Sequence, residues 1–375
     1  MKKHIIICTN ILWSIPTFRK YLIKALIEKG YRVSVVGSDE NFSDSTITKL
    51  DELDVVTHIV PIDRSSGNPF TNLKYIYSLR RVFKVYKPDL VLFYSVKPNI
   101  FGSFICGVMN IPFVNTINGL GSGLINNNIT SFFVKTLYRL ALKKSKMVLF
   151  QNNDDLAFFI KHKLVPASIT GYVPGSGIDT DEYCIPIKVF TKKRTFLLVG
   201  RLLKDKGVYE YIEAIKELKK ENIPNVEFLL GGIIDPYNPS AVTQEEIDTW
   251  EMLGLISYIG KTDDIESFFD LADFIVCPSY REGLSRLLIE AASCRKAIIT
   301  TNVPGCRDIV EENFNGFLCE PRNSNSLKEV ILRGIKTSNA DLVRFGENSR
   351  EIVKSRFNES MVNKVYLDII EESLA

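Results

Sequence analysis

The sequence predicts an α/β protein of two domains, each with a parallel β-sheet covered by helices on both faces. Its 375 residues exceed one comfortable hydrophobic core, since a domain typically holds about 100–200 residues. Short runs of β-branched residues alternate with helical patterns, and this alternation begins twice along the chain. Such repetition of strand and helix is typical of parallel sheets with helices on both faces.

The first series of strands and helices fills the N-terminal half of the chain. Strands are expected at 4–8, 32–37, 89–94, 113–117 and 147–152. Helices are expected between them, at about 17–29, 71–86, 100–109 and 130–143. The strand runs are short and apolar, as strands buried on both faces usually are.

The second series repeats this order. Strands are expected at 195–200, 226–232, 257–260, 273–278 and 297–301, with helices over 207–220 and from about 283 onward. A proline and a basic cluster at 183–194 separate the two series, which predicts domains over 1–187 and 188–358. The last helical segment, 359–375, has no strand of its own, and we expect it to cross back onto the first domain.

The composition excludes several classes of protein. Apolar residues make up 45% of the chain and charged residues 24%, which is ordinary for a folded protein. The seven cysteines form no CxxC pair, which favours buried cytosolic thiols over a zinc site. The apolar run at the start is too short for a signal peptide. The uncharged stretch 98–134 is interrupted by asparagines and glycines, which argues against a membrane span.

A basic motif follows the first strand of the second domain and reads GRLLKDKG over Gly200–Gly207. The carboxyl ends of the strands in an open α/β sheet face the ligand crevice. Arg201 and Lys206 can therefore point at one anion, and a diphosphate would suit them. The alternative is a solvated basic turn that caps a helix.

An acidic motif follows a later strand and consists of Glu282, Gly283, Leu284, Ser285 and Glu290. Gly283–Ser285 is expected to open a helix, whose free N–H groups favour negatively charged oxygens. Glu290, two turns along, is expected to share a helix face with Glu282, so that both can bind sugar and ribose hydroxyls. Helix surface charge is the alternative. Together the two motifs predict a nucleotide-sugar site at one sheet edge.

These motifs resemble the donor-site signature of glycosyltransferase family 4, whose members are retaining enzymes of the GT-B fold with two Rossmann-like domains. The resemblance covers essentially the whole chain. It implies that Arg201 and Lys206 neutralise the donor diphosphate and stabilise it as leaving group, with no metal or other cofactor. It also implies that Glu290 binds the ribose and that Glu282 holds hydroxyls of the transferred sugar or acts as nucleophile. The backbone of Gly200 and of Gly283–Ser285 would contribute to donor binding.

Two N-terminal segments resemble the acceptor side of relatives that assemble O-antigen and capsule. Asn118, Gly119 and Gly121 belong to a glycine-rich loop after a strand, near which many relatives carry a histidine that this chain lacks. The segment around Lys97 resembles a His-Lys-Pro sequence of these relatives, and in this chain Val96 stands in place of the histidine. A plain turn is the alternative for the glycines. The segment that begins at Arg64 also resembles a segment of relatives that act on lipid-linked sugars. A simple helix entry is the alternative.

The charge distribution supports such an acceptor. Residues 1–187 hold 22 Lys and Arg against 14 Asp and Glu, a net charge of +8, whereas the remainder carries −5. Basic residues gather at 74–87 and 135–146, which favours peripheral attachment to the anionic inner face of the bacterial inner membrane. No nucleic-acid partner is expected. Ordinary solvated helix faces are the alternative.

The resemblance implies a cytoplasmic enzyme that transfers a hexose or N-acetylhexosamine to a polyprenyl-diphosphate-linked glycan in surface polysaccharide biosynthesis. UDP is the favoured donor nucleotide because it is frequent in the family. Two rivals share the two-lobed α/β organisation. A Rossmann oxidoreductase is disfavoured because no GxGxxG follows the first strand. A non-catalytic sugar-binding protein would be expected to carry an export signal.

Overall fold

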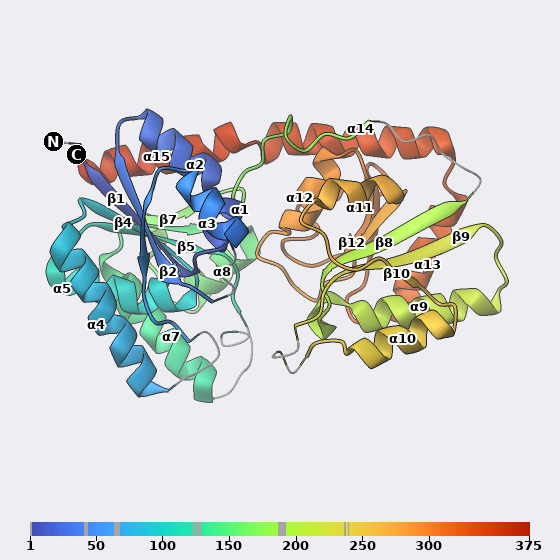
Figure 1. The fold of residues 1–375 in the computed structure, drawn as a ribbon, viewed down its shortest axis with the longest axis horizontal. Helices are drawn as coiled ribbons and strands as arrows, with labels where there is room; N and C mark the ends of the chain where they lie inside the picture. The colour runs from blue at the N-terminus through green and yellow to red at the C-terminus, as the bar shows by residue number, and fades with distance from the viewer. Residues whose placement is uncertain are drawn as a thin grey trace. The chain divides into compact units, whose positions relative to one another are not determined.

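The computed structural model describes residues 2–40, 44–63, 68–121, 124, 129–186, 193–235, 238 and 240–375. Contacts divide the chain into two units (Figure 1). Unit 1 comprises residues 1–177 and 359–375, and unit 2 comprises residues 178–358. Each unit holds one parallel sheet with helices packed on both faces, which confirms the predicted fold class.

The sheet of unit 1 has the strand order β3-β2-β1-β4-β5-β6-β7. Its strands are β1 His4–Ile11, β2 Arg32–Ser38, β3 Val56–Ile59, β4 Leu90–Tyr94, β5 Phe113–Ile117, β6 Met147–Phe150 and β7 Thr170–Tyr172. All neighbouring pairs are parallel. The strand order reverses between β1 and β4, and ligands bind at such switch points in open α/β sheets.

Helices cover both faces of this sheet. They are α1 Ser14–Phe18, α2 Lys20–Glu28, α3 Asp44–Asp51, α4 Pro69–Tyr86, α5 Ser103–Met109, α7 Ile129–Ala141, α8 Asn153–Lys161 and α15 Glu359–Leu374, with a π-helical turn over Pro98–Gly102. Helix α4 begins where the sequence favours it, because Asn68 caps it and Pro69 occupies the first turn. The helix expected over 17–29 is interrupted at Arg19, whose φ of −128° ends α1 before α2 begins.

The C-terminal helix α15 belongs to unit 1. Its buried residues Val362, Tyr366 and Ile370 join the apolar cluster formed by β1, β4 and α2. The Tyr366 hydroxyl lies 3.0 Å from the Thr116 hydroxyl at the end of β5. Helix α15 therefore completes the core of this sheet, and the Thr116–Tyr366 contact joins residues that are 250 positions apart in the chain.

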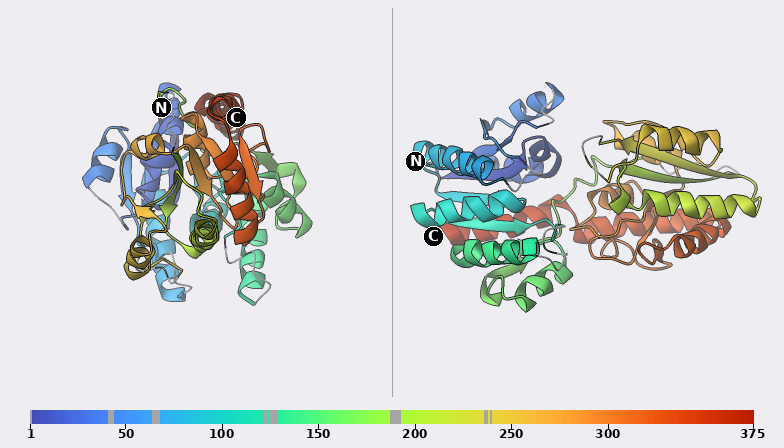
Figure 2. Two further views of the ribbon diagram at one scale, coloured as in Figure 1. Left: turned by 90° about the vertical axis from the view of Figure 1, so that its right-hand side faces the viewer. Right: turned by 90° about the horizontal axis from the view of Figure 1, so that it is seen from below.

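The sheet of unit 2 has the order β10-β9-β8-β11-β12-β13 and reverses between β8 and β11. Its strands are β8 Arg194–Arg201, β9 Val226–Ile233, β10 Ser257–Tyr258, β11 Phe274–Cys277, β12 Ala297–Thr301 and β13 Gly316–Cys319. Its helices are α9 Val208–Lys220, α10 Gln244–Met252, α11 Ile265–Leu271, α12 Arg286–Ser293, α13 Ser324–Lys336 and α14 Asn339–Arg356. Helices α9 and α13 pack side by side on one face (Figure 2).

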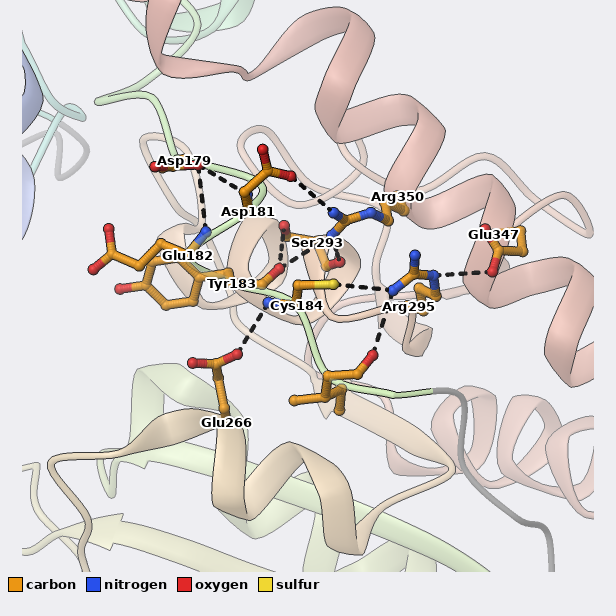
Figure 3. A network of polar contacts seen from close by, with 11 residues as sticks. Asp179, Asp181, Glu182, Tyr183, Cys184, Glu266, Ser293, Arg295, Glu347 and Arg350 are labelled. Atoms are coloured by element: carbon orange, nitrogen blue, oxygen red, sulfur yellow. Dashed lines mark hydrogen bonds and ion pairs between the residues drawn. The ribbon is translucent and has the colours of Figure 1, made fainter.

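The segment 178–186 is fixed to unit 2 by a polar network (Figure 3). Arg350 of α14 donates to the carbonyl oxygens of Tyr183 and Ser293, at 3.2 and 2.7 Å. The N–H of Cys184 donates to Glu266 of α11 at 3.0 Å. The predicted domain boundary, after residue 187, falls within 187–192, which lie outside the described residues. The contacts divide the chain after Gly177.

None of the helices in the described part of the chain combines the length and hydropathy needed to cross a bilayer.

Candidate functional site

Two of the predicted site residues form an ion pair at the switch point of unit 2. Lys206 ends the short 3₁₀ turn Lys204–Lys206 after β8, and Glu282 lies in the loop after β11. The Lys206 ammonium pairs with Glu282 Oε1, and the two side chains are only 23% and 17% exposed. The structure thus joins the basic and the acidic motif in one direct contact.

A close backbone approach makes this pairing possible. Gly207, directly after Lys206, has a φ of 76°, and a Cβ atom there would lie 2.2 Å from the carbonyl oxygen of Pro278. Any side chain at this position would therefore separate the two loops. The N–H of Tyr280 also donates to the carbonyl oxygen of Asp205 at 2.9 Å. The terminal glycine of the basic motif is thus required by geometry.

The ion pair is supported by charge and by a hydroxyl. Burial would lower the pKa of Lys206, but the neighbouring Glu282 carboxylate outweighs this effect and holds the pKa above its ordinary value. Ser279 donates its hydroxyl to the same Oε1 atom at 2.8 Å. In the described part of the chain, the donors to Glu282 thus converge on Oε1, which leaves Oε2 for a ligand hydroxyl. Ser279 lies only three residues before Glu282 but was not among the predicted site residues.

Arg201 lies at the end of β8 with an exposed side chain, close enough for its charge to oppose the protonation of Lys206. Gly200, before it, has a φ of 144°, and a Cβ on Gly232 of β9 would lie 1.8 Å from the Gly200 carbonyl oxygen. The ends of β8 and β9 therefore approach each other only because Gly232 has no side chain. Unlike Lys206, Arg201 makes no ion pair with any described residue, so it can bind a ligand without breaking one.

The acidic motif departs from its predicted helix. Helix α12 begins at Arg286, so Glu282 lies in a loop and does not share a helix face with Glu290, contrary to the expectation. The loop is held by residues 304–305, because Glu282 donates its N–H to Pro304 and Ser285 donates its N–H to Gly305, at 3.2 and 2.8 Å. Of the predicted backbone donors, the N–H of Ser285 is thus already engaged, while Gly283 and Leu284 lie in the bend before it.

Glu290 belongs to a separate network. It is 9% exposed and accepts a hydrogen bond from Arg286 at 2.7 Å. Arg286 in turn lies 3.5 Å from the Tyr183 hydroxyl. Burial, followed by the charge of Glu290, raises the pKa of Tyr183 to about 12. Glu290 is therefore a buried, charge-balanced carboxylate on the first turns of α12.

In unit 1, the structure brings the two acceptor-side segments together. A Cβ atom on Gly121 would lie 4.0 Å from the Val96 side chain, next to Lys97. Lys97 donates to the Asn72 side chain at 2.8 Å and to the carbonyl oxygen of Asp63, and burial lowers its pKa. Asn118 is exposed and Gly119 half-buried. Arg64 lies outside the described residues.

Within the described ranges, no group of three or more His, Cys, Asp or Glu side chains is placed to hold a metal ion.

Two family models match the chain. One described as "Glycosyl transferase 4-like" matches residues 12–152, and one described as "Glycosyl transferases group 1" matches residues 180–352. Together they span most of both units and include both motifs of unit 2.

Several characterised proteins are similar to this chain. The N,N'-diacetylbacillosaminyl-diphospho-undecaprenol alpha-1,3-N-acetylgalactosaminyltransferase of Campylobacter jejuni is 28% identical over 336 residues, which cover 85% of each chain. The capsular polysaccharide biosynthesis glycosyltransferase CapM of Staphylococcus aureus is 26% identical over 96% of each. The UDP-Gal:alpha-D-GlcNAc-diphosphoundecaprenol alpha-1,3-galactosyltransferase of Escherichia coli is 25% identical over 80% of each.

Solved structures share the fold. A glycosyltransferase from Rickettsia africae ESF-5 has a TM-score of 0.78 at 21% identity and covers 100% of this chain and 99% of its own. Anabaena HepE in complex with UDP-glucose has a TM-score of 0.76 at 18% identity, with 98% and 99% covered.

Proposed function

Because this chain belongs to the family 4 glycosyltransferases of the GT-B fold, we propose that it transfers a sugar from a nucleotide diphosphate, preferably UDP, to a polyprenyl-diphosphate-linked glycan. The transfer retains the anomeric configuration of the donor and requires no metal. This transfer is a step in the biosynthesis of a surface polysaccharide such as O-antigen or capsule.

The observation that carries this proposal is the grouping of Arg201, Lys206 and Glu282 at the switch point of unit 2. As the glycosidic bond to the donor phosphate breaks, negative charge grows on the departing diphosphate. Arg201, which is exposed and makes no ion pair with the described carboxylates, neutralises this charge. Lys206 adds a second positive charge from the turn after β8. Preorganised cations of this kind stabilise the transition state more than the ground state.

Glu282 has a different role in this proposal. Its Oε1 atom is occupied by Lys206 and Ser279, so its position is fixed before any donor binds. Its Oε2 atom accepts hydrogen bonds from hydroxyls of the transferred sugar. Glu290, already balanced by Arg286, binds the ribose hydroxyls. The two glutamates thus serve opposite ends of the donor.

The acceptor part of the proposal is supported by the activities of two relatives, the Campylobacter jejuni and Escherichia coli transferases, both of which act on sugars linked to diphospho-undecaprenol. Unit 1 adds a surface suited to the membrane that holds such lipids. Helices α4 and α7 begin at the same end of unit 1 (Figures 1 and 2). Phe70 and Ile129, in their first turns, are 80% and 78% exposed.

Charged and apolar side chains share the exposed faces of these two helices. On α4 the exposed apolar residues Leu73 and Tyr77 are followed, at spacings of three to four residues, by the exposed basic residues Arg81 and Lys84. Exposed aromatic and basic residues on one helix face are typical of proteins that lie on anionic membranes. We therefore assign these faces of α4 and α7 to reversible attachment at the cytoplasmic leaflet.

A transfer assay tests the proposed function. Purified protein is incubated with a panel of UDP- and GDP-sugars and an undecaprenyl-diphosphate-linked mono- or disaccharide, and lipid products are separated and their new linkage assigned by NMR. We expect one donor to give an α-linked product. Tight binding of a UDP-sugar with no transfer to any lipid-linked acceptor would instead indicate a non-catalytic sugar-binding protein.

A further inference from the structure

Arg19 of unit 1 is a buried arginine at the junction between α1 and α2. It is 5% exposed, and its guanidinium carbon lies 3.7 Å from the ring centroid of Tyr94. Its backbone N–H still donates to Ile15, but the φ of −128° breaks the helix at this residue. Tyr94 is the last residue of β4, so the guanidinium lies at the carboxyl end of that strand.

Arg19 has no oppositely charged partner among the described residues of unit 1. Among the residues that the structure describes, none makes a hydrogen bond or an ion pair with the Arg19 side chain. A guanidinium carries five N–H donors, and a tyrosine ring satisfies none of them through its face. Buried charges are normally paired, because an isolated one is costly. The stacking on Tyr94 offsets only part of that cost.

The surroundings of Arg19 are rigid and polar at the same sheet edge. The Tyr94 ring packs 6.2 Å from the Tyr366 ring, measured between centroids. Tyr366 is fixed in turn by the Thr116 hydroxyl at the end of β5. Arg19 is therefore held at the β1–β4 switch point of unit 1, where open α/β sheets bind ligands.

We infer that Arg19 binds the diphosphate of the polyprenyl-linked acceptor, an inference that rests on the proposed function. Guanidinium groups bind phosphate oxygens through paired N–H donors, which suits a diphosphate. The donor diphosphate already has its cations in unit 2, so this isolated cation of unit 1 matches the second diphosphate of the reaction. That group keeps all its bonds during transfer, so Arg19 is a binding residue and takes no part in the chemistry.

Binding of farnesyl diphosphate, measured by calorimetry with saturating UDP to occupy the donor site, tests the inference. Arg19→Met removes the charge while keeping an unbranched side chain against Tyr94. We expect it to weaken farnesyl diphosphate binding by about 10- to 100-fold, as expected for loss of charge-assisted hydrogen bonds. Lys24→Met, which removes an exposed charge from α2, is the matched control and should bind as the parent does. The affinity for UDP should be unchanged in both variants.

Thermal unfolding separates binding from a structural role. If Arg19 serves to bind an anion, its unpaired charge costs stability while no ligand is bound. Ligand-free Arg19→Met should then be at least as stable as the ligand-free parent. Arg19→Lys keeps the charge and should retain part of the affinity. Parent-like binding of farnesyl diphosphate by Arg19→Met, or no binding by the parent, would overturn the inference.

The inference and the proposed function can fail separately. Binding that depends on Arg19 in a protein that transfers no sugar would refute the function alone. Transfer with an unchanged KM for the lipid acceptor in Arg19→Met would refute the role of Arg19 alone.

Discussion

Replacing Lys206 by methionine should destabilise unit 2, because it leaves the Glu282 carboxylate charged and without its partner. Breaking a fully buried ion pair typically costs about 3–5 kcal/mol, much of it the cost of the remaining charge. The two side chains are 23% and 17% exposed, and Ser279 still donates to Glu282. We therefore expect a smaller loss of about 2–3 kcal/mol in the free energy of unfolding.

Denaturant unfolding measures this loss. The chain has two tryptophans, and Trp250 of α10 is buried in the core of unit 2. In a Trp13→Phe background, tryptophan fluorescence therefore reports on unit 2 alone. Adding Glu282→Gln to Lys206→Met removes the unpaired charge and should restore most of the lost stability.

The exposed pair Lys216–Glu213 on α9 provides the control. Lys216→Met should cost no more than about 1 kcal/mol, as for other surface ion pairs. If Lys206→Met costs no more stability than Lys216→Met, or if Glu282→Gln fails to offset the loss, the Lys206–Glu282 pair does not hold the site together.

Three further outcomes are expected. Because the pKa of Lys206 is raised above about 10.5 in the folded protein, its contribution to stability should be complete below that pH and be lost only as the pH rises further. A difference in unfolding free energy between the parent and Lys206→Met that vanishes already between pH 7 and 9 would contradict this. Glu290→Gln should weaken UDP binding measured by calorimetry, whereas Glu282→Gln should lower the transfer rate and leave UDP affinity nearly intact; equal losses of UDP affinity would refute the division of roles. Reversing the exposed α4 charges as R80E/R81E/K84E should release the protein from anionic liposomes at lower salt, and sedimentation identical to the parent's would exclude that surface.

The sequence predicted most of the fold because the relevant signals are local. Apolar runs and helical periodicity depend only on neighbouring residues, so strands such as β1 and β8 and helices such as α4 and α9 fall where expected. Helices α3, α8, α10, α11, α13 and α14 were not predicted. Strands β3, β7 and β13 were missed. Each has at most four residues and lies at an edge of its sheet. The break between α1 and α2 at Arg19 was also missed.

The sequence predicted that the candidate residues of unit 2 follow strands of one sheet, but not how these residues contact one another. Spacing along the chain indicated that Arg201, Lys206 and Glu282 lie at one sheet edge. It could not show that Lys206 and Glu282, 76 residues apart, pair directly. It also misplaced the start of α12, because the turn held by Pro304 and Gly305 depends on tertiary hydrogen bonds.

Turnover of the Arg201→Ala variant tests the central claim most directly, because the Arg201 side chain is exposed and its loss should leave the fold intact. The assay measures initial rates of sugar transfer from the preferred nucleotide sugar to the lipid-linked acceptor. Lys204→Ala, in the same loop and also exposed, is the matched control. We predict that Arg201→Ala lowers kcat by roughly 10²–10³-fold, as for other losses of one transition-state charge stabiliser, while Lys204→Ala transfers nearly as the parent does. Near-parent turnover by Arg201→Ala would contradict the assignment of the donor diphosphate to this edge of unit 2.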